Sequence, residues 1–279
     1  MYMFNNAKSL QLGKQQDHAV SGVYKDGYYI GVMDGHGNNT CIDILRNIFY
    51  DTIAEADDSA YKIFQTIQYF NIKQDLYGSG STFNFTKICV TDELTITNYN
   101  IGDSETVVFI NGELIFRSIV HSIESKNERI RVKTYLEERG GITVGWAPLP
   151  ISENRITNTR SDVCNFKTGE SIVPTQSLGH NNMTGYSPDV YSFTCKLTDH
   201  VRIVSGSDGF WNMIIKNNEN DMDKVKTMKL DELLAFAEMR WKKEWEFASN
   251  PKYPDKIIIT SFPDYDDISV AIWDNKYEM

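Results

Sequence analysis

The stretch Tyr28–Asn38, YYIGVMDGHGN, decides the fold and the chemistry that we expect of this chain. Its apolar first half is typical of a β-strand, and Asp34 stands where that strand is expected to end, followed at once by Gly35, His36 and Gly37. Glycines at a strand end allow a tight turn and let a ligand approach the main chain. Taken alone, the segment is equally compatible with an ordinary hairpin or strand-to-helix turn.

The same arrangement recurs at three further places. Asp103 follows the strand-like run LTITNYNIG, Asp208 follows VRIVSGS, and Asp266–Asp267 precede ISVAIW. In an antiparallel sheet the end of one strand lies beside the start of its neighbour, so these acids and Asp34 can gather at one edge. Uncompensated carboxylates repel one another, and hard divalent cations such as Mg²⁺ or Mn²⁺ remove that repulsion. The pattern therefore predicts a metal site.

Seven short segments, spread over nearly the whole chain, resemble in their order the motifs of the metal-dependent protein phosphatases, the type 2C serine/threonine phosphatases. The segments are QQDHAV from residue 15, VMDGHGN from 32, GSGST from 78, NIGDS from 100, TQSLGH from 175, SGSDGFWNMI from 205 and DDISVAIW from 266. One such motif is a weak signal, whereas seven in one order are specific. The resemblance implies an α+β fold, with a central sandwich of two antiparallel β-sheets flanked by α-helices in four layers, α-β-β-α.

The resemblance also implies roles for individual residues. Two or more Mg²⁺ or Mn²⁺ ions would be bound by Asp17, Asp34, the Gly35 carbonyl, Asp103, Asp208 and Asp266. Asp34 would bridge two ions that activate a water, while Asp103 and Asp208 would hold an additional, weaker ion. His36 would protonate the leaving serine or threonine oxygen, a task suited to an imidazole that titrates near neutrality.

Basic residues of the motifs are partly missing, which leaves two functions open. Lys14 is the nearest basic residue to the place where family members often carry a phosphate-binding arginine, and Glu105 and Gln176 replace two further basic residues. His180 stands where the family has an acid. The intact acids favour an active protein serine/threonine phosphatase. The missing arginines favour a catalytically impaired relative that binds phosphoproteins or regulates them.

Composition narrows the partners and the location. The 279 residues are 41% hydrophobic, and the motifs span both ends, so we expect a single phosphatase-like catalytic domain over residues 1–279. The net charge of −10 disfavours nucleic acid and gives no sign of membrane attraction. The sequence shows neither a secretory signal nor an apolar run of about 20 residues. We expect a soluble, monomeric, cytoplasmic signalling enzyme whose partner is a phosphoprotein substrate.

The hydrophobic pattern also predicts the main elements. We expect strands at 18–24, 27–33 and 268–273, and one meander of four strands within 81–119. Helices are expected from 39 to about 53, at 59–70, at 126–138, in a short segment after Asp208, and at 230–247. Residues of about 142–190 lack clean periodicity and are expected to form an irregular, flap-like region beside the active site.

Overall fold

The computed structural model describes residues 4–25, 27–55, 59–73, 75–136, 140–166, 169–248 and 257–275. Within these ranges the chain forms two central antiparallel sheets, helices on both outer faces, and a further sheet at one end. The strands of the first central sheet are β1 (Phe4–Leu10), β7 (Glu105–Ile110), β8 (Glu113–Arg117), β14 (Val201–Gly206) and β17 (Ile268–Asp274). Their order in space is β1-β17-β14-β7-β8, so the first and last strands of the chain are neighbours.

The second central sheet carries the Tyr28–Asn38 stretch in its middle. Its strands are β2 (Asp17–Tyr24), β3 (Gly27–Gly37), β4 (Ser79–Ser81), β5 (Phe83–Val90), β6 (Glu93–Ile101), β12 (Leu178–Gly179) and β13 (Asp189–Lys196). The order is β12-β4-β3-β5-β6-β13, and β2 also pairs with β3. Because β3 continues past Val32 through the DGHG segment, it pairs first with β5 and then with β4.

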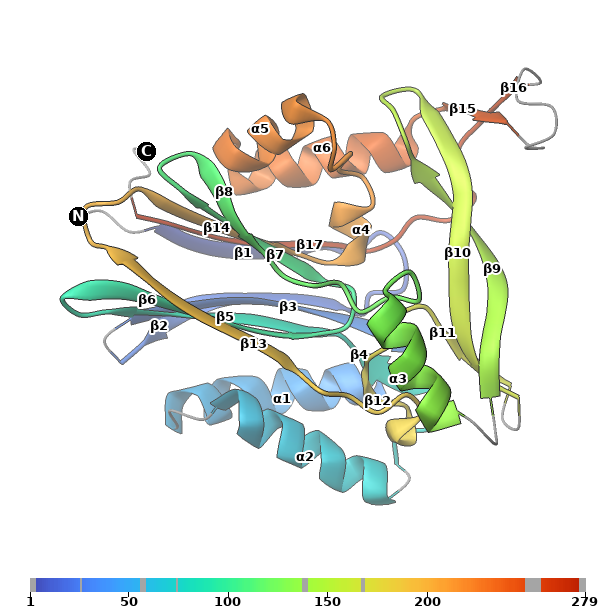
Figure 1. Cartoon of the computed structure of the whole chain (residues 1–279), viewed down its shortest axis with the longest axis horizontal. Coiled ribbons are helices and arrows are strands. Elements are labelled where there is room, and N and C mark those ends of the chain that lie inside the picture. The colour runs from blue at the N-terminus through green and yellow to red at the C-terminus, as the bar shows by residue number, and fades with distance from the viewer. Residues whose placement is uncertain are drawn as a thin grey trace.

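Helices cover both outer faces of the sandwich (Figure 1). Those on the second sheet are α1 (Thr40–Glu55) and α2 (Ser59–Lys73), and those on the first are α4 (Asp208–Trp211), α5 (Glu219–Thr227) and α6 (Leu230–Lys242). One apolar core fills the space between the two sheets. A second lies between the first sheet and its helices, and a third lies between the second sheet and its helices. The predicted fold class, an α+β sandwich in four layers, is confirmed. No helix in the described ranges is long and apolar enough to cross a membrane.

The region expected to be irregular is instead mostly a sheet. It contains β9 (Gly140–Pro150), β10 (Arg155–Asn165) and β11 (Glu170–Ile172), joined by β15 (Trp245–Ala248) and β16 (Ile257–Thr260). The prediction of an irregular region was wrong because β9 and β10 form a long hairpin ribbon with a register shift between Asn158 and Arg160. Such a ribbon needs no clean alternation of apolar and polar residues. The helix α3 (Lys126–Leu136) lies beside it (Figure 1).

Two other predicted elements need correction. The four strands within 81–119 exist, but they do not form one meander, since β5 and β6 belong to one central sheet and β7 and β8 to the other. The helix expected at 230–247 ends at Lys242, because Trp245–Ala248 pairs with β10 and β16 as a strand. The helix expected at 126–138 corresponds to α3, which spans Lys126–Leu136. Residues 137 and 138 of the prediction lie outside the described part of the chain.

The predicted strands at 18–24, 27–33 and 268–273 and the helices from 39 and 59 are confirmed. At the start of α1 the Asn38 side chain accepts a hydrogen bond from Thr40 N at 3.0 Å. Asn111 and Gly112 form the hairpin turn between β7 and β8, with φ values of 53° and 84°. These elements bring several strand ends to the side of the sandwich where α4, β4 and β12 lie (Figure 1).

Candidate active site

The first two predicted acids lie side by side on neighbouring strands. Asp17 begins β2 and is the register partner of Asp34 near the end of β3. Gly35 N donates to Gln16 O at 3.1 Å, which continues this pairing beyond the acids. Thr82 fixes Asp34 from the other side, because its main-chain N donates to Asp34 O at 2.9 Å and its Oγ1 accepts from Asp34 N at 3.0 Å. The carboxyls therefore project from a rigid strand pair.

The other two acids are brought in by the first central sheet. Ser207 N donates to Ser269 O at 3.0 Å, and Ser269 N donates to Ser207 Oγ at 3.0 Å, so the start of α4 is tied to β17. Asp208 begins α4, and Asp266 precedes β17. Gly209 allows the two segments to come into contact. A Cβ at this position would lie 3.3 Å from Asp266 Cβ and would overlap the carbonyl oxygen of Asp267.

Electrostatics show that these four carboxyls form one cluster. Burial raises the pKa of Asp17 to about 7, opposed by a hydrogen bond from Ser207 and assisted by the charge of Asp208. The pKa of Asp34 is raised well above its usual value, first by burial and then by the charges of Asp17, Asp208 and Asp266. Burial and the charges of Asp208 and Asp17 raise the pKa of Asp266. Asp34, Asp208 and Asp266 of the sheet-edge prediction thus lie together with Asp17, which the family resemblance had indicated.

The donor set fits a divalent cation, although the carboxyls are not gathered as ligands of one ion. No three Asp, Glu, His or Cys side chains in the described ranges stand at the spacing of a ready metal site. Against this, Asp17 Oδ2 is buried without a hydrogen-bond partner, and Asp34 and Asp208 share a hydrogen bond that requires a proton. Acids that lack a cation relieve their repulsion by sharing protons or separating. The carboxylate oxygens of the four acids are the ligand type that Mg²⁺ and Mn²⁺ prefer.

Stability without metal should fall as the pH rises from about 6.5 to about 8. The folded protein holds protons on Asp17 and Asp34 that the unfolded chain, with pKa values near 3.8, has already released. The lowered pKa of His36 acts in the opposite direction, but only below its ordinary value of 6.5. Melting temperatures measured in EDTA across this range should decrease, and Mn²⁺ should remove the trend. A flat or rising melting temperature in EDTA would contradict the clustering of the acids.

Asp103 lies half-buried in the turn between β6 and β7, after Gly102, whose φ is 103°. It therefore stands at a strand end, as the sequence pattern indicated. Its part in a metal site stays a prediction.

Asp267 has a role that the sequence did not reveal. Its carboxylate accepts hydrogen bonds from Gly13 N at 2.7 Å and from Gln16 N at 2.8 Å. These bonds hold the segment before β2 against the segment before β17, next to Asp17 and Asp266. The available signal was only its position beside Asp266, which did not distinguish a ligand from a residue that fixes the main chain.

His36 is held in place by both ring nitrogens. Nε2 is 2.9 Å from Ser177 Oγ, and Nδ1 is 3.4 Å from Asp34 O. Ser177 Oγ also donates to Leu178 O at 2.8 Å, so this hydroxyl links the His36 ring to the neighbouring main chain. Burial, with the neighbouring His180, lowers the pKa of His36 to about 3. The expectation of an imidazole that titrates near neutrality is wrong for this structure, in which His36 is neutral at pH 7.

His180 lies against His36, which the sequence did not lead us to expect. The two rings stack at a centroid distance of 4.9 Å and an interplanar angle of 22°. His180 Nδ1 pairs with Glu170, and the ring lies over Gly80, where a Cβ would come within 2.2 Å of it. The only signal for this contact in the sequence was that His180 replaces the acid of the family motif in the segment SLGH.

Lys14 lies at the exposed edge of the site. Its charge lowers the pKa values of both Asp266 and His36, which places it close to each of them. Its side chain is exposed, so it remains accessible to a ligand. This position agrees with the predicted contact to a substrate phosphate, which stays a prediction.

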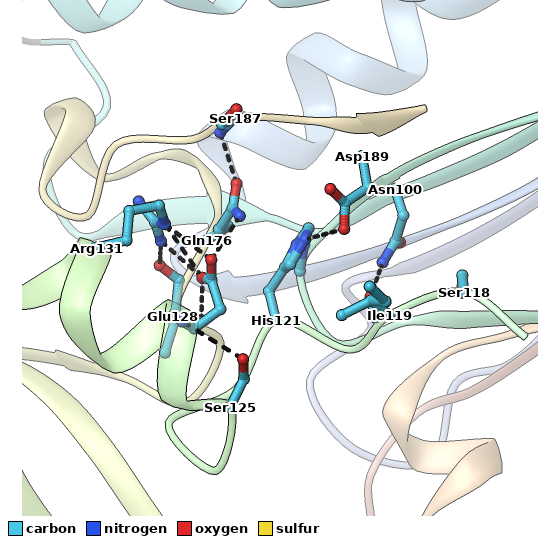
Figure 2. Close-up of polar contacts among 12 residues, drawn as sticks. Asn100, Ser118, Ile119, His121, Ser125, Glu128, Arg131, Gln176, Ser187 and Asp189 are labelled. Carbon is cyan, nitrogen blue, oxygen red and sulfur yellow. Dashed lines mark hydrogen bonds and ion pairs between the residues drawn. The ribbon is translucent and has the colours of Figure 1, made fainter. Parts of the chain in front are cut away.

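The two residues that replace motif arginines are committed to internal contacts. Glu105 is buried and is paired with Lys216 at 2.6 Å and with Arg117 at 3.3 Å. Gln176 donates to Glu128 at 3.1 Å and accepts from Ser187 N at 2.6 Å (Figure 2). Neither residue therefore replaces the lost positive charge at the acid cluster.

Solved structures with the same architecture share one activity in most of their descriptions. A serine/threonine phosphatase of S. agalactiae is 21% identical, with a TM-score of 0.58 over 98% of this chain and 99% of that one. A serine-threonine phosphatase 2C of Toxoplasma gondii is 12% identical, with a TM-score of 0.61 over 97% and 94%. The chain has the fold of the type 2C serine/threonine phosphatases.

This fold is also found in a protein described by another role. A sex-determining protein of C. elegans is 16% identical, with a TM-score of 0.64 over 98% of this chain, which spans only 65% of the length of that protein. No protein-family model matches the sequence, and no curated protein matches it. At these identities, likeness to the type 2C phosphatases establishes the fold, and the activity has to be argued from the site.

Proposed function

We propose that this chain is a metal-dependent protein phosphatase that hydrolyses phosphoserine and phosphothreonine with a metal-activated water. The observation that carries the proposal is the cluster of four acids at strand ends of a phosphatase fold, in which burial and the charge of Asp208 raise the pKa values of Asp17, Asp34 and Asp266. Such a cluster is unfavourable without a positively charged partner, because each buried carboxylate raises the free energy of the others. Binding of Mg²⁺ or Mn²⁺ would relieve that repulsion.

In this proposal the metal ions and the acidic and basic residues of the site have separate roles. Bound divalent cations supply neutralisation of the phosphoryl oxygens and a water of lowered pKa. One ion would be held by Asp17, Asp34 and the Gly35 carbonyl, and the other by Asp34, Asp208 and Asp266. Asp103, from its turn, would serve the additional, weaker ion together with Asp208. Lys14 would attract the substrate phosphate.

A second candidate function is a catalytically impaired relative that binds phosphoproteins or regulates them. The observation in its favour is that Glu105 and Gln176 are tied to internal partners, so two positive charges of the motifs are not replaced. A protein that only bound phosphate would have no need of Asp17, Asp34, Asp208 and Asp266 as a buried acidic cluster. We therefore favour the enzyme.

The distinguishing experiment is phosphate release from a panel of phosphoserine and phosphothreonine peptides. Protein stripped with EDTA should be inactive, and Mn²⁺ or Mg²⁺ should restore release. Peptide binding without release at any metal concentration would favour the second candidate. We further propose that the physiological substrate is a phosphoprotein and that residues 1–279 act as a single, monomeric domain. A cytoplasmic signalling role is proposed on the same basis.

Lys14→Ala should raise KM for phosphopeptides by up to about five-fold, because an exposed charge pair contributes about 1 kcal/mol or less. Lys14→Arg should match or exceed wild type, since arginine presents paired donors to a phosphate. The control is Lys62→Ala, an exposed lysine on α2. Steady-state kinetics with one phosphothreonine peptide would measure all three. An unchanged KM in Lys14→Ala would show that Lys14 is an ordinary surface residue that does not contact the substrate.

A further inference from the structure

His121 makes two hydrogen bonds to the residue before Asp103. It lies between β8 and α3, and its side chain is only 2% exposed. His121 N donates to Gly102 O at 2.9 Å, and Gly102 N donates to His121 Nδ1 at 2.9 Å. The main chain and the ring of one histidine thus satisfy both polar groups of Gly102.

The hydrogen bonds fix the tautomer of His121. A main-chain N–H only donates, so Nδ1 must carry the lone pair and Nε2 must carry the proton. Nε2 accordingly faces the Asp189 carboxylate at 3.1 Å (Figure 2). Asp189 is held in β13, where it is the register partner of Asn100 in β6. The acceptor offered to Gly102 is therefore set by a carboxylate on a neighbouring strand.

Gly102 occupies a conformation that needs this support. Its φ of 103° lies in a region that other residues rarely adopt, and a Cβ would come within 2.6 Å of the Thr82 side chain. Thr82 is the residue that binds both main-chain polar groups of Asp34. The turn that carries Asp103 is thus packed directly against the residue that fixes the acid cluster.

On its other side, His121 contacts the loop that carries the hydrogen-bond partner of His36. Thr175 N donates to His121 O at 2.9 Å, and Thr175 Oγ1 donates to Glu128 at 2.6 Å. Ser177 Oγ, two residues further on, lies within hydrogen-bond distance of His36 Nε2, at 2.9 Å. His121 therefore stands between two site-bearing segments that come from distant parts of the sequence.

We propose that His121 is a positioning residue, whose Nδ1 lone pair holds the Gly102–Asp103 turn in the conformation that serves the site. The inference deepens the proposed function and rests on it for the use of Asp103. The contact between His121 and Gly102, which we call the clamp, rests only on the hydrogen bonds. His121 touches neither substrate nor metal in this role; it determines where the Asp103 main chain lies relative to Thr82.

Two substitutions separate the two ends of the imidazole. His121→Asn places an amide oxygen where Nδ1 was, so the acceptor for Gly102 N is retained and the donor to Asp189 is lost. His121→Gln places its amide group near Nε2, so the contact with Asp189 is retained and the acceptor for Gly102 is lost. Both variants remove the ring, and they therefore control for each other in packing.

Amide hydrogen exchange of the segment 100–106 is the first readout. Protection of this segment should fall roughly ten-fold or more in His121→Gln, because Gly102 N is left buried without an acceptor, and much less in His121→Asn. Equal protection in both variants, or a greater loss in His121→Asn, would overturn the clamp. Exchange in α6, remote from the turn, would report any general loss of folding.

Calorimetric Mn²⁺ binding is the second readout, because it does not require turnover. His121→Gln should weaken the weaker binding event several-fold, and His121→Asn should leave it near wild type. Lost protection in His121→Gln together with unchanged Mn²⁺ binding would contradict the proposed effect of His121 on metal binding through Asp103. If the wild type bound no Mn²⁺, the proposed function would fail, whereas the exchange experiment would still decide the clamp.

Discussion

Asp34→Asn is expected to abolish metal-dependent phosphate release, with a loss on the order of 10³-fold or more, because several kcal/mol of charge stabilisation disappear. Asp34 is the acid whose pKa responds to the charges of Asp17, Asp208 and Asp266 together. Asparagine keeps the shape and the main-chain bonds to Thr82 but removes the charge. The measurement is the rate of phosphate release from a phosphothreonine peptide at saturating Mn²⁺.

The same substitution should raise the melting temperature in EDTA at neutral pH, since it removes one repelling carboxyl from a metal-free cluster. A gain of stability together with a loss of activity separates a ligand from a merely structural residue. The matched control is Asp231→Asn, an acid of α6 with 77% side-chain exposure, which should leave activity unchanged and, because it loses a surface ion pair with Lys8, should not raise the melting temperature. Wild-type activity in Asp34→Asn would remove Asp34 from the metal site.

His36→Ala is expected to lower kcat by up to about 10²-fold, and by the same factor on a phosphothreonine peptide and on p-nitrophenyl phosphate. His36 is neutral at pH 7, since its pKa is about 3. Its ring joins Asp34 O to Ser177 and thereby fixes the strand end that carries the acids. A loss of positioning does not depend on the leaving group, so both substrates should suffer equally.

The comparison of substrates tests the general-acid role predicted from the sequence. A serine or threonine alkoxide needs a proton as it leaves, whereas nitrophenolate needs almost none. A much greater loss on the phosphothreonine peptide would show that His36 becomes a proton donor in the loaded enzyme. Ser177→Ala is a useful companion, because it removes the hydroxyl bonded to Nε2 without touching the ring.

Part of the site was predictable because it depends on strand ends. Asp34, Asp208 and Asp266 stand beside apolar runs, which are visible in a sequence, and Asp208 and Asp266 meet through the pairing of β14 and β17. Asp17, the register partner of Asp34, was predicted only from the resemblance to the type 2C phosphatases. The chain crosses from one central sheet to the other at the Gly102 turn, and local pattern does not reveal which sheet a strand joins, so the metal contact of Asp103 stays a prediction.

The rest of the site depends on contacts that carry no periodic signal. His180 reaches His36 from a segment where residues 180, 181 and 182 all have positive φ, and its partner Glu170 belongs to the end sheet. That sheet was itself missed, because the pattern of β9 and β10 is irregular. Trp245 had the spacing of a helical face, yet pairing with β16 prevailed over the local preference.

Calorimetric titration of the EDTA-stripped protein with Mn²⁺ tests most directly whether the four acids form a metal centre. The chemistry of the cluster predicts at least one strong binding event in the wild type, with protons released as it occurs, because Asp17 and its neighbours hold protons until a cation replaces them. Asp34→Asn should lose that event, whereas Asp231→Asn should retain it. A wild-type protein that binds no Mn²⁺, or an Asp34→Asn variant that binds it unchanged, would contradict the metal centre.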